Sequence, residues 1–295
     1  MTIEDKTITS EPAGSPVLMT GKEVARQIRK QCAAEIEALK ARHKILPGLA
    51  VVRVGDDPSS VSYADRITQS FEVAGITVTV IALPANASRS VLQSELLRLN
   101  VLREIAGVIV QMPLPNHIGL DAVIDVLDPQ KDVDGIHPVN IGRLSLGLDA
   151  FVPATPAGGI AILDYYGVPI EGKRAVVVGR SSVVGKPLAQ LLLARNATVT
   201  VAHSRSRNLF ELISEAEILA SAVGKPAFIP GDSIKKGAAV LDFGAAMVDG
   251  RMTGDIAFDS AIERVAAITP VPGGTGPVTN AMLLKNTIKA IKRFV

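Results

Sequence analysis

The sequence predicts an α/β protein made of two units, each with a mostly parallel sheet and helices on both faces. Short β-branched runs alternate with amphipathic helical stretches along most of the chain. The length of 295 residues lies where chains usually divide into domains, which happens above about 250–300 residues. The apolar run Ala175-Val176-Val177-Val178 is typical of a strand that is buried on both faces of a doubly wound sheet.

The first unit is expected to begin with a long helix. Val24, Ile28, Cys32 and Ile36 recur at helical spacing and define its apolar face. Helices and strands then alternate, an order that favours parallel pairing of the strands. The expected elements are helix 21–42, strand 49–54, helix 60–74, strand 76–83, helix 88–100 and strand 107–111.

A second unit is expected to begin after Thr155-Pro156. Its final helix is long enough to return to the first unit. The expected domains are therefore a tail over 1–17, a first domain over 18–155 with 278–295, and a second domain over 156–277. The expected elements are helix 158–166, strand 174–178, helix 186–194, strand 198–202, helix 209–214, strands 218–222, 238–242 and 266–269, and helix 278–293.

The composition excludes several classes of protein. A net charge of +2 gives no reason to expect a nucleic-acid or membrane partner. No apolar run has the roughly 20 residues of a membrane span, and the polar, acid-containing first residues resemble neither a secretory signal nor a mitochondrial presequence. The single cysteine, Cys32, fits a reducing compartment, so we expect a cytoplasmic protein. No ligand-spaced cluster predicts a metal site.

The turn Gly179-Arg180-Ser181-Ser182-Val183-Val184-Gly185-Lys186-Pro187 leads from an expected strand directly into a helix. Free N–H groups at such a helix N-terminus bind the diphosphate of a dinucleotide. The spacing departs from G-x-G-x-x-G, because Ser181 stands in the middle and the turn is one residue longer. A plain strand–turn–helix connection would use similar residues and remains the alternative.

The residues after the next strand indicate which dinucleotide is bound. Enzymes that use NAD commonly place a carboxylate there to bind the ribose 2′-hydroxyl. This chain has His203-Ser204-Arg205-Ser206-Arg207 instead, and cations with hydroxyls suit a 2′-phosphate. Together with Arg180, three guanidinium groups are available. The pattern favours NADP over NAD, and a solvated basic loop is the alternative.

Four unusual strings occur in a fixed order along the chain: Gly55-Asp56-Asp57-Pro58-Ser59-Ser60 before Tyr63, Gln111-Met112-Pro113-Leu114-Pro115, Lys131-Asp132-Val133-Asp134-Gly135-Ile136-His137-Pro138, and Pro270-Val271-Pro272-Gly273-Gly274-Thr275-Gly276-Pro277-Val278-Thr279. Each string alone could be an ordinary loop, because Gly and Pro are common in turns. Together they resemble the methylenetetrahydrofolate dehydrogenase/methenyltetrahydrofolate cyclohydrolase family over about residues 18–293.

The resemblance implies an N-terminal folate-binding domain, a Rossmann-type NADP-binding domain, a folate cleft between them and a homodimer. It also implies a role in one-carbon metabolism, which serves purine biosynthesis. In the site, it places Tyr63 against the folate, Gln111 at the reacting region and Asp134, rather than Asp132, on the pterin, whose adjacent donors a carboxylate suits. The other matching positions are Ser60, Pro272, Gly273 and Gly274 for the substrate, and Gly179, Arg180, Ser181, Gly185, Ser204, Arg205 and Ala245 for the cofactor.

One departure from the family bears on the chemistry. The family has a lysine four residues after the tyrosine, and here that position is Ile67. Arg66 lies about 100° round the helix, and its guanidinium does not act as a base. Oxidation of the methylene group requires no proton removal, whereas hydrolysis of the methenyl product does, and a tuned base assists it by roughly 10²–10⁴-fold.

Three functions remain open from the sequence. The favoured one is a dehydrogenase with weak or absent cyclohydrolase activity. The second is the complete bifunctional enzyme, which would use another group or a water chain in place of the lysine to give 10-formyltetrahydrofolate. The third is a non-catalytic NADP-binding paralogue, which replacements such as Ala245 and Ala246 for the family's Ile-Asn would suit.

Overall fold

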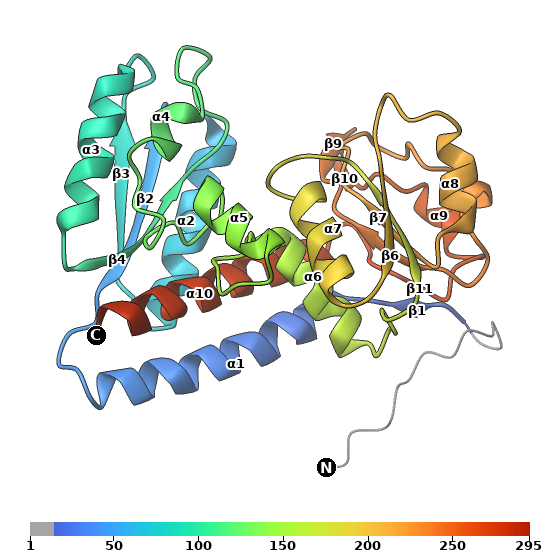
Figure 1. Ribbon diagram of the computed structural model, residues 1–295, viewed down its shortest axis with the longest axis horizontal. Coiled ribbons are helices and arrows are strands. Elements are labelled where there is room, and N and C mark those ends of the chain that lie inside the picture. Colours follow the sequence, from blue (N-terminus) through green and yellow to red (C-terminus); the bar gives the residue numbers. More distant parts are fainter. Residues whose placement is uncertain (1–14) are drawn as a thin grey trace. The chain divides into compact units, whose positions relative to one another are not determined.

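The computed structural model describes residues 15–295, with the side chain of Ser59 omitted. Most of the tail expected over 1–17 therefore lies outside the described residues. The described chain divides into two compact units (Figure 1). Unit 1 contains residues 15–26 and 155–279, and unit 2 contains residues 27–154 and 280–295.

Unit 2 is built on a parallel three-stranded sheet with the order β3-β2-β4. Two long helices, α1 (Gly21–Lys40) and α10 (Thr275–Phe294), begin in unit 1 and continue into unit 2. The remaining elements are β2 (Gly48–Val54), α2 (Pro58–Val73), β3 (Val78–Leu83), α3 (Arg89–Val101), β4 (Ile105–Val110), α4 (Asp121–Ile124) and α5 (Pro138–Ser145).

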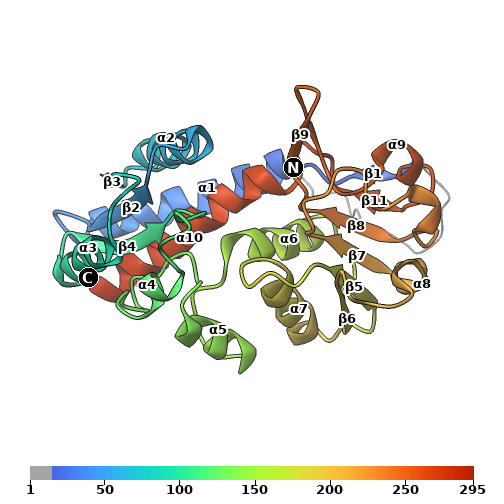
Figure 2. The same ribbon diagram turned by 90° about the horizontal axis from the view of Figure 1, so that it is seen from above.

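Both faces of this sheet are buried. On one face Ala50 and Val52 form a core with α3 and α4, through residues such as Leu96 and Val123. The alternate strand residues, including Val51, are fully buried as well, and helices α1, α2 and α10 cover that opposite face (Figures 1 and 2). The expected parallel sheet with helices on both faces is therefore confirmed for unit 2.

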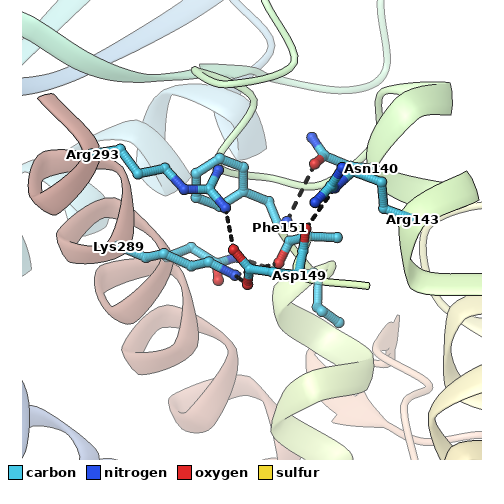
Figure 3. Close-up of polar contacts among 9 residues, drawn as sticks. Asn140, Arg143, Asp149, Phe151, Lys289 and Arg293 are labelled. Atoms are coloured by element: carbon cyan, nitrogen blue, oxygen red, sulfur yellow. Dashed lines mark hydrogen bonds and ion pairs between the residues drawn. The ribbon is translucent and has the colours of Figure 1, made fainter. Parts of the chain in front are cut away.

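The C-terminal helix returns to unit 2, as the sequence predicted. Near its end, Lys292 Nζ donates to Glu35 Oε2 on α1 at 2.6 Å. On the same stretch of α10, Lys289 and Arg293 both bind the carboxylate of Asp149, and both cations lie over the ring of Phe151 (Figure 3). The helix is thus fastened to the loop that follows α5.

Unit 1 contains a six-stranded parallel sheet with the order β1-β11-β8-β7-β5-β6. Helix α7 connects β5 to β6, and α8 connects β6 to β7. Its elements are β1 (Val17–Leu18), α6 (Ala154–Tyr165), β5 (Arg174–Val178), α7 (Gly185–Ala194), β6 (Thr198–Ala202), α8 (Leu209–Glu215), β7 (Ile218–Ser221), the 3₁₀ helix η1 (Gly231–Ser233), β8 (Ala239–Asp242), β9 (Ala246–Val248), β10 (Arg251–Thr253), α9 (Phe258–Ala261) and β11 (Ala267–Ile268).

The direction of the strand order changes beside β5, where β6 lies on one side and β7 on the other. Open α/β sheets bind ligands beyond the carboxyl ends of the strands at such a switch point. In this sheet the position is marked by Gly179 after β5 and Ala222 after β7. The fold thus predicts a ligand site at the turn that the sequence had singled out.

The structure differs from the sequence expectation in several short elements. Val17 and Leu18 pair with β11 in the sheet of unit 1. The sequence had predicted a tail that ends at residue 17 and a first domain that begins at residue 18. The backbone of these two residues satisfies its hydrogen bonds there, with Val17 N donating to Ala266 O at 2.8 Å. The antiparallel hairpin β9–β10 was not expected.

Among the described residues, no helix is both long enough and apolar enough to cross a membrane.

Candidate functional site

Helix α2 carries Tyr63 at the carboxyl edge of the unit 2 sheet, directly after β2 ends. Asp57 caps the helix by accepting from Ser60 N at 3.0 Å and from Ser60 Oγ at 3.2 Å, so the expected substrate residue Ser60 already has a protein partner. Pro58 at the start of the helix supports this beginning. The local sequence thus fixes where the helix begins and which way Tyr63 is presented.

Tyr63 is half-buried, and two charges lie near it. Burial, followed by the neighbouring Asp134 carboxylate, raises the pKa of Tyr63 to about 12, which outweighs the opposite effect of Arg66. The guanidinium of Arg66 lies 5.9 Å from the centre of the tyrosine ring. The phenol is therefore protonated at neutral pH and is able to donate a hydrogen bond.

Ile67 lies one helical turn beyond Tyr63 and is fully buried. Ala64 and Phe71, which lie one turn away on α2, are buried as well. An aliphatic side chain at this position offers no donor, acceptor or proton. The structure therefore provides no replacement base at position 67 itself.

Gln111 follows β4 and has an unusual environment. Its backbone N–H continues the sheet by donating to Val52 O at 2.8 Å. The side chain is only 5% exposed, yet neither the nitrogen nor the oxygen of its amide has a hydrogen-bond partner among the described residues. Buried amides are rarely left in this state, because each unmet group costs about 1–3 kcal/mol. A polar ligand would satisfy both atoms.

Asp132 and Asp134 lie in one turn but differ in their contacts. Asp132 is buried and accepts from the N–H groups of Ile136 and His137 and from the amide of Asn140. Asp134 makes no hydrogen bond or ion pair among the described residues. Burial, and then the charge of Asp132, raises the pKa of Asp134 to about 7. Asp132 thus organises the turn, and Asp134 is available to a ligand.

The two histidines near these strings have structural partners. His117 Nε2 pairs with Ala87 O at 2.8 Å. His137 caps α5, because its Nδ1 accepts from Val139 N at 3.1 Å, and its Nε2 lies 3.0 Å from Ile124 O. The backbone thus engages both ring nitrogens of His137 and the Nε2 of His117.

In unit 1, the turn from β5 to α7 is shaped by two glycines. Gly179 has φ +125°, and a Cβ there would lie 2.5 Å from Ala222 O. A Cβ on Gly185 would collide with the carbonyl oxygen of Gly179. Only glycine at both positions allows the backbone to close around this concave turn.

Ser181 explains the departure from the usual glycine pattern. Its Oγ accepts from Val184 N at 3.1 Å and from Gly185 N at 3.3 Å, and its carbonyl accepts from Lys186 N. The amides at the start of α7 are therefore capped by the protein. The backbone N–H groups over 180–183 make no hydrogen bond among the described residues. These turn amides fit a diphosphate, as the nucleotide hypothesis requires.

The basic loop after β6 is compact and presents its cations outward. His203 N donates to Ser206 Oγ at 2.9 Å, and Arg205 N donates to His203 Nδ1 at 3.2 Å. The side chains of Ser204 and Arg205 are exposed and make no ion pair among the described residues. Because β5 and β6 are neighbours, this loop and Arg180 stand at the same edge of the sheet. Their chemistry fits a second phosphate.

Two buried carboxylates near the loop that carries Ala245 were not identified from the sequence. Asp242 accepts from the N–H groups of Gly244, Asp255 and Ile256, and burial is the main reason that its pKa is raised to about 6. Asp255 accepts from Ser221 Oγ and from the N–H groups of Val223 and Lys225. Together they fix the loop that carries the exposed Ala245. The sequence signal that could have identified Asp242 is its position at the end of an apolar strand.

Pro272, Gly273 and Gly274 belong to unit 1, whereas Ser60, Tyr63, Gln111 and Asp134 belong to unit 2. The carbonyl of Gly273 accepts from Gly21 N at 2.8 Å, and a Cβ on Gly274 would lie 2.6 Å from Pro270 O. This tight loop precedes α10. Within unit 2, Asp134 lies close enough to Tyr63 for its negative charge to help raise the pKa of the phenol.

Comparison with known proteins gives consistent matches over both units. The family model "Tetrahydrofolate dehydrogenase/cyclohydrolase, catalytic domain" matches residues 19–134, and the model "Tetrahydrofolate dehydrogenase/cyclohydrolase, NAD(P)-binding domain" matches residues 153–295. The "Bifunctional protein FolD" of Herpetosiphon aurantiacus is 48% identical over 275 residues, which is 93% of this chain and 96% of the relative.

Solved structures agree with these matches. A bifunctional FolD methylenetetrahydrofolate dehydrogenase/cyclohydrolase from Campylobacter jejuni has a TM-score of 0.93 and 37% identity, with 95% of this chain and 100% of that chain covered. The FolD of Trypanosoma brucei, solved with NADP cofactor and an inhibitor, has a TM-score of 0.90 and 38% identity, with 95% and 98% covered.

Proposed function

The chain belongs to the tetrahydrofolate dehydrogenase/cyclohydrolase family, and we propose that it oxidises 5,10-methylenetetrahydrofolate to 5,10-methenyltetrahydrofolate with NADP. Family membership confirms the resemblance of the four sequence strings. The observation that carries the proposal is the unpartnered Asp134 carboxylate beside the protonated Tyr63. A pterin presents adjacent N–H and amino donors, and such a carboxylate accepts both.

The proposed roles of the unit 2 residues follow from their environments. Asp134 holds the pterin, and Tyr63 packs against the folate and donates its phenolic proton. Gln111 bonds to polar atoms near the reacting carbon, which would satisfy its two unmet amide atoms. Ser60 keeps the start of α2 in place. Removal of a hydride from the methylene group needs no base, so accurate positioning is the main contribution of these residues.

NADP, when bound, supplies the acceptor of the hydride. We propose that the turn amides over 180–183 bind its diphosphate and that Gly179 and Gly185 leave room for it. Ser204, Arg205 and Arg180 bind the 2′-phosphate, while Ala245 and the loop over 272–274 border the reacting end. The relative from Trypanosoma brucei, whose structure contains NADP, supports this choice over NAD.

Two observations point in opposite directions on the second activity, hydrolysis of the methenyl product. Relatives with 44–48% identity are named bifunctional, which favours a chain that also hydrolyses the methenyl product to 10-formyltetrahydrofolate. The fully buried Ile67 in place of the family lysine favours weak or absent hydrolysis. We therefore propose the dehydrogenase as the principal activity and the complete bifunctional enzyme as the second candidate.

A paired assay on one purified sample tests the proposal. Methylenetetrahydrofolate is added with NADP and, separately, with NAD, and absorbance records NADPH, NADH and methenyl product. Hydrolysis of methenyltetrahydrofolate is then measured against the spontaneous rate. We expect NADP-dependent oxidation and a near-spontaneous hydrolysis rate. NADP binding without oxidation would instead identify a non-catalytic paralogue, and rapid hydrolysis would establish the bifunctional enzyme.

Replacement of Ile67 by lysine tests the reason for weak hydrolysis. Ile67→Lys is expected to raise the hydrolysis rate by about 10²-fold or more, the range of general acid–base assistance. Ile67→Met serves as the control, because it is similar in volume and unbranched but carries no proton. If both variants leave hydrolysis unchanged while oxidation persists, the absent lysine is not what limits the second step.

We also propose that the protein forms a homodimer in the cytoplasm, where its product would enter one-carbon metabolism and purine biosynthesis. The terminal strand β6 of the unit 1 sheet has exposed residues along most of its length, and an open sheet edge is a surface on which a second copy pairs. Light scattering after size exclusion tests the dimer, which a monomeric mass would contradict.

A further inference from the structure

Asn286 is a buried amide on α10, far from Asp134 in the sequence but close to the turn that carries it. We propose that Asn286 is a positioning residue that fixes the Asp134 turn and thereby sets the affinity for the pterin. This inference rests on the proposed function, since it specifies how the folate-binding carboxylate is held. Asn286 itself would contact neither substrate nor cofactor.

The Asp134 carboxylate cannot be oriented by its own contacts, because it has none among the described residues. Its position therefore depends on the backbone on either side. Val133 is fully buried, and its N–H donates to Lys131 O at 2.9 Å. Gly135 has φ +70°, and a Cβ there would lie 2.6 Å from Phe151 O. The turn thus lies directly against the segment around Phe151.

Asn286 joins both sides of this contact. Its Nδ2 donates to Val133 O at 2.8 Å and to Val152 O at 2.8 Å. The side chain is 8% exposed, so water does not readily replace these bonds. The Nδ2 atom thereby uses both of its protons. One holds Val133, which precedes Asp134, and the other holds Val152, in the segment that lies against Gly135.

A second amide holds the turn from within its own stretch of sequence. Asn140 donates to Asp132 Oδ2 at 2.8 Å and accepts from Phe151 N at 3.3 Å (Figure 3). Asp132 in turn accepts two backbone N–H groups of the turn. Asn140 therefore maintains the shape of the turn, whereas Asn286 anchors it to α10. Loss of Asn286 should leave the turn formed but less well placed.

This difference predicts which kinetic constant changes. A carboxylate that shifts by a fraction of an ångström no longer meets two donors of a rigid pterin at once. The cofactor residues belong to unit 1 and do not bond to Asn286. Removal of the amide should therefore weaken folate binding selectively and leave NADP binding unchanged.

The test compares Asn286→Ala with Thr287→Val. Thr287 is the adjacent residue and is fully buried, and its hydroxyl donates to Leu283 O within the helix, its one side-chain hydrogen bond among the described residues. We expect Asn286→Ala to raise the KM for methylenetetrahydrofolate about tenfold or more, with the KM for NADP within about twofold of wild type. Thr287→Val should lower the melting temperature and leave both constants unchanged. Equal effects of the two variants on the folate KM would overturn the proposal.

Hydrogen exchange provides a readout that does not depend on turnover. The amides over 133–137 should exchange faster in Asn286→Ala and at the wild-type rate in Thr287→Val. Asn286→Ser, which keeps one donor, should give an intermediate rate and serves if the alanine variant does not fold. If wild type fails to oxidise the folate, the proposed function fails, while faster exchange in these variants still supports the anchoring role. Unchanged exchange in the Asn286 variants would refute it.

Discussion

At the scale of single residues, the two aspartates of one turn have opposite environments. Both carboxylate oxygens of Asp132 are bonded to the protein, through two backbone N–H groups and one side-chain amide. Asp134 is desolvated without a partner, and its pKa is raised to about 7. The aspartate proposed to bind the pterin is therefore the one that the protein leaves without a hydrogen-bond partner among the described residues.

Asp134→Asn tests the proposed contact with the pterin. An asparagine presents one acceptor and a donor in place of two acceptors, so folate affinity should fall by about 10- to 100-fold, in line with the roughly 1.5–3 kcal/mol of hydrogen bonds to a charged group. The variant should leave NADP affinity unchanged. Titration calorimetry with each ligand measures both affinities, and a parallel loss of NADP binding would argue against a local role.

The same carboxylate predicts a pH dependence. Because the pKa of Asp134 is raised to about 7, the group is increasingly protonated as the pH falls below that value. A protonated carboxyl loses its charge-assisted bonds to the pterin. Folate affinity should therefore be highest above about pH 7 and should fall as the pH decreases through it. The Asp134→Asn variant should lack this dependence, and a wild-type affinity that is flat across neutral pH would contradict the assignment.

Arg205 is the residue through which cofactor choice can be tested. Its exposed guanidinium has no ion-pair partner among the described residues, so Arg205→Gln should cost little stability. We expect the KM for NADP to rise by about 10-fold or more and the KM for NAD to change little, because only NADP carries the 2′-phosphate. Arg251→Gln, which removes an exposed arginine from β10 of the same unit, is the control. Equal loss with both cofactors would place Arg205 outside the phosphate site.

At the scale of elements, the turn between β5 and α7 depends on a close approach of two peptide groups. The Cα of Gly185 lies against the carbonyl of Gly179, and Ser181 closes the turn by capping the helix. The backbone N–H groups over 180–183 make no hydrogen bond among the described residues. The glycine spacing and the helix cap therefore act together to close the turn. The turn keeps its shape although its glycines are one residue further apart than usual.

Gly185→Ala should disrupt this turn. The added methyl would overlap Gly179 O, and overpacking of this kind typically costs about 1–3 kcal/mol. We expect a lower melting temperature together with loss of NADP binding. Gly276→Ala is the matched control, because that helical glycine of the same unit has open space around it and alanine favours helix. If Gly185→Ala binds NADP normally, the proposed diphosphate position is wrong.

The helices and strands that span several periods were predictable from the sequence. The expected positions of α1, β2, α3 and β5, among others, are confirmed to within a few residues. The sequence did not predict α5, which has 8 residues. The other elements that were not predicted are shorter, such as α4 with 4 residues and β1 with 2 residues. Such segments contain about one helical turn or one strand repeat, which is too little for a periodic signal.

At the scale of the whole molecule, contacts between distant parts of the sequence limited what could be anticipated. The family motifs indicated which side chains to examine, and their binding roles remain predictions. Nothing in the local sequence indicated that Asn286 bonds to a carbonyl 153 positions away. In the sequence, Asn286 cannot be distinguished from an ordinary polar residue of a helix, because neither its burial nor its partners are visible there. The burial of Ile67 likewise required the fold, although its identity was visible at once.

The attachment of α10 also predicts how stability responds to pH. Hydrogen bonding by Lys289, and secondarily by Arg293, lowers the pKa of Asp149 below its usual value of 3.8. A lowered carboxyl pKa contributes stability that is present above about pH 4 and is lost as the pH falls through the lowered value. Asp149 is well exposed, so solvent screening limits the contribution to about 1 kcal/mol or less.

Asp149→Asn should therefore reduce the free energy of unfolding by up to about 1 kcal/mol at neutral pH and progressively less under acidic conditions. Chemical denaturation at several pH values measures the difference. Asp65→Asn changes an exposed aspartate of the same unit that has no ion pair among the described residues, and it should have little effect at any pH. A deficit for Asp149→Asn that persists undiminished in acid would show that the carboxylate charge is not its cause.

The returning helix has a consequence for how the protein is made. After the part of unit 1 that precedes them, residues 27–154 of unit 2 leave the ribosome. The long stretch 155–279 of unit 1 follows, and then residues 280–295, which belong to unit 2. Until Asn286 emerges, the carbonyls of Val133 and Val152 lack their donor. A nascent chain arrested before that point would contain almost all of unit 1, and its unit 2 would lack the hydrogen bonds from Asn286. The turn that carries Asp134 is thus expected to acquire its final geometry only after residues 280–295 have emerged.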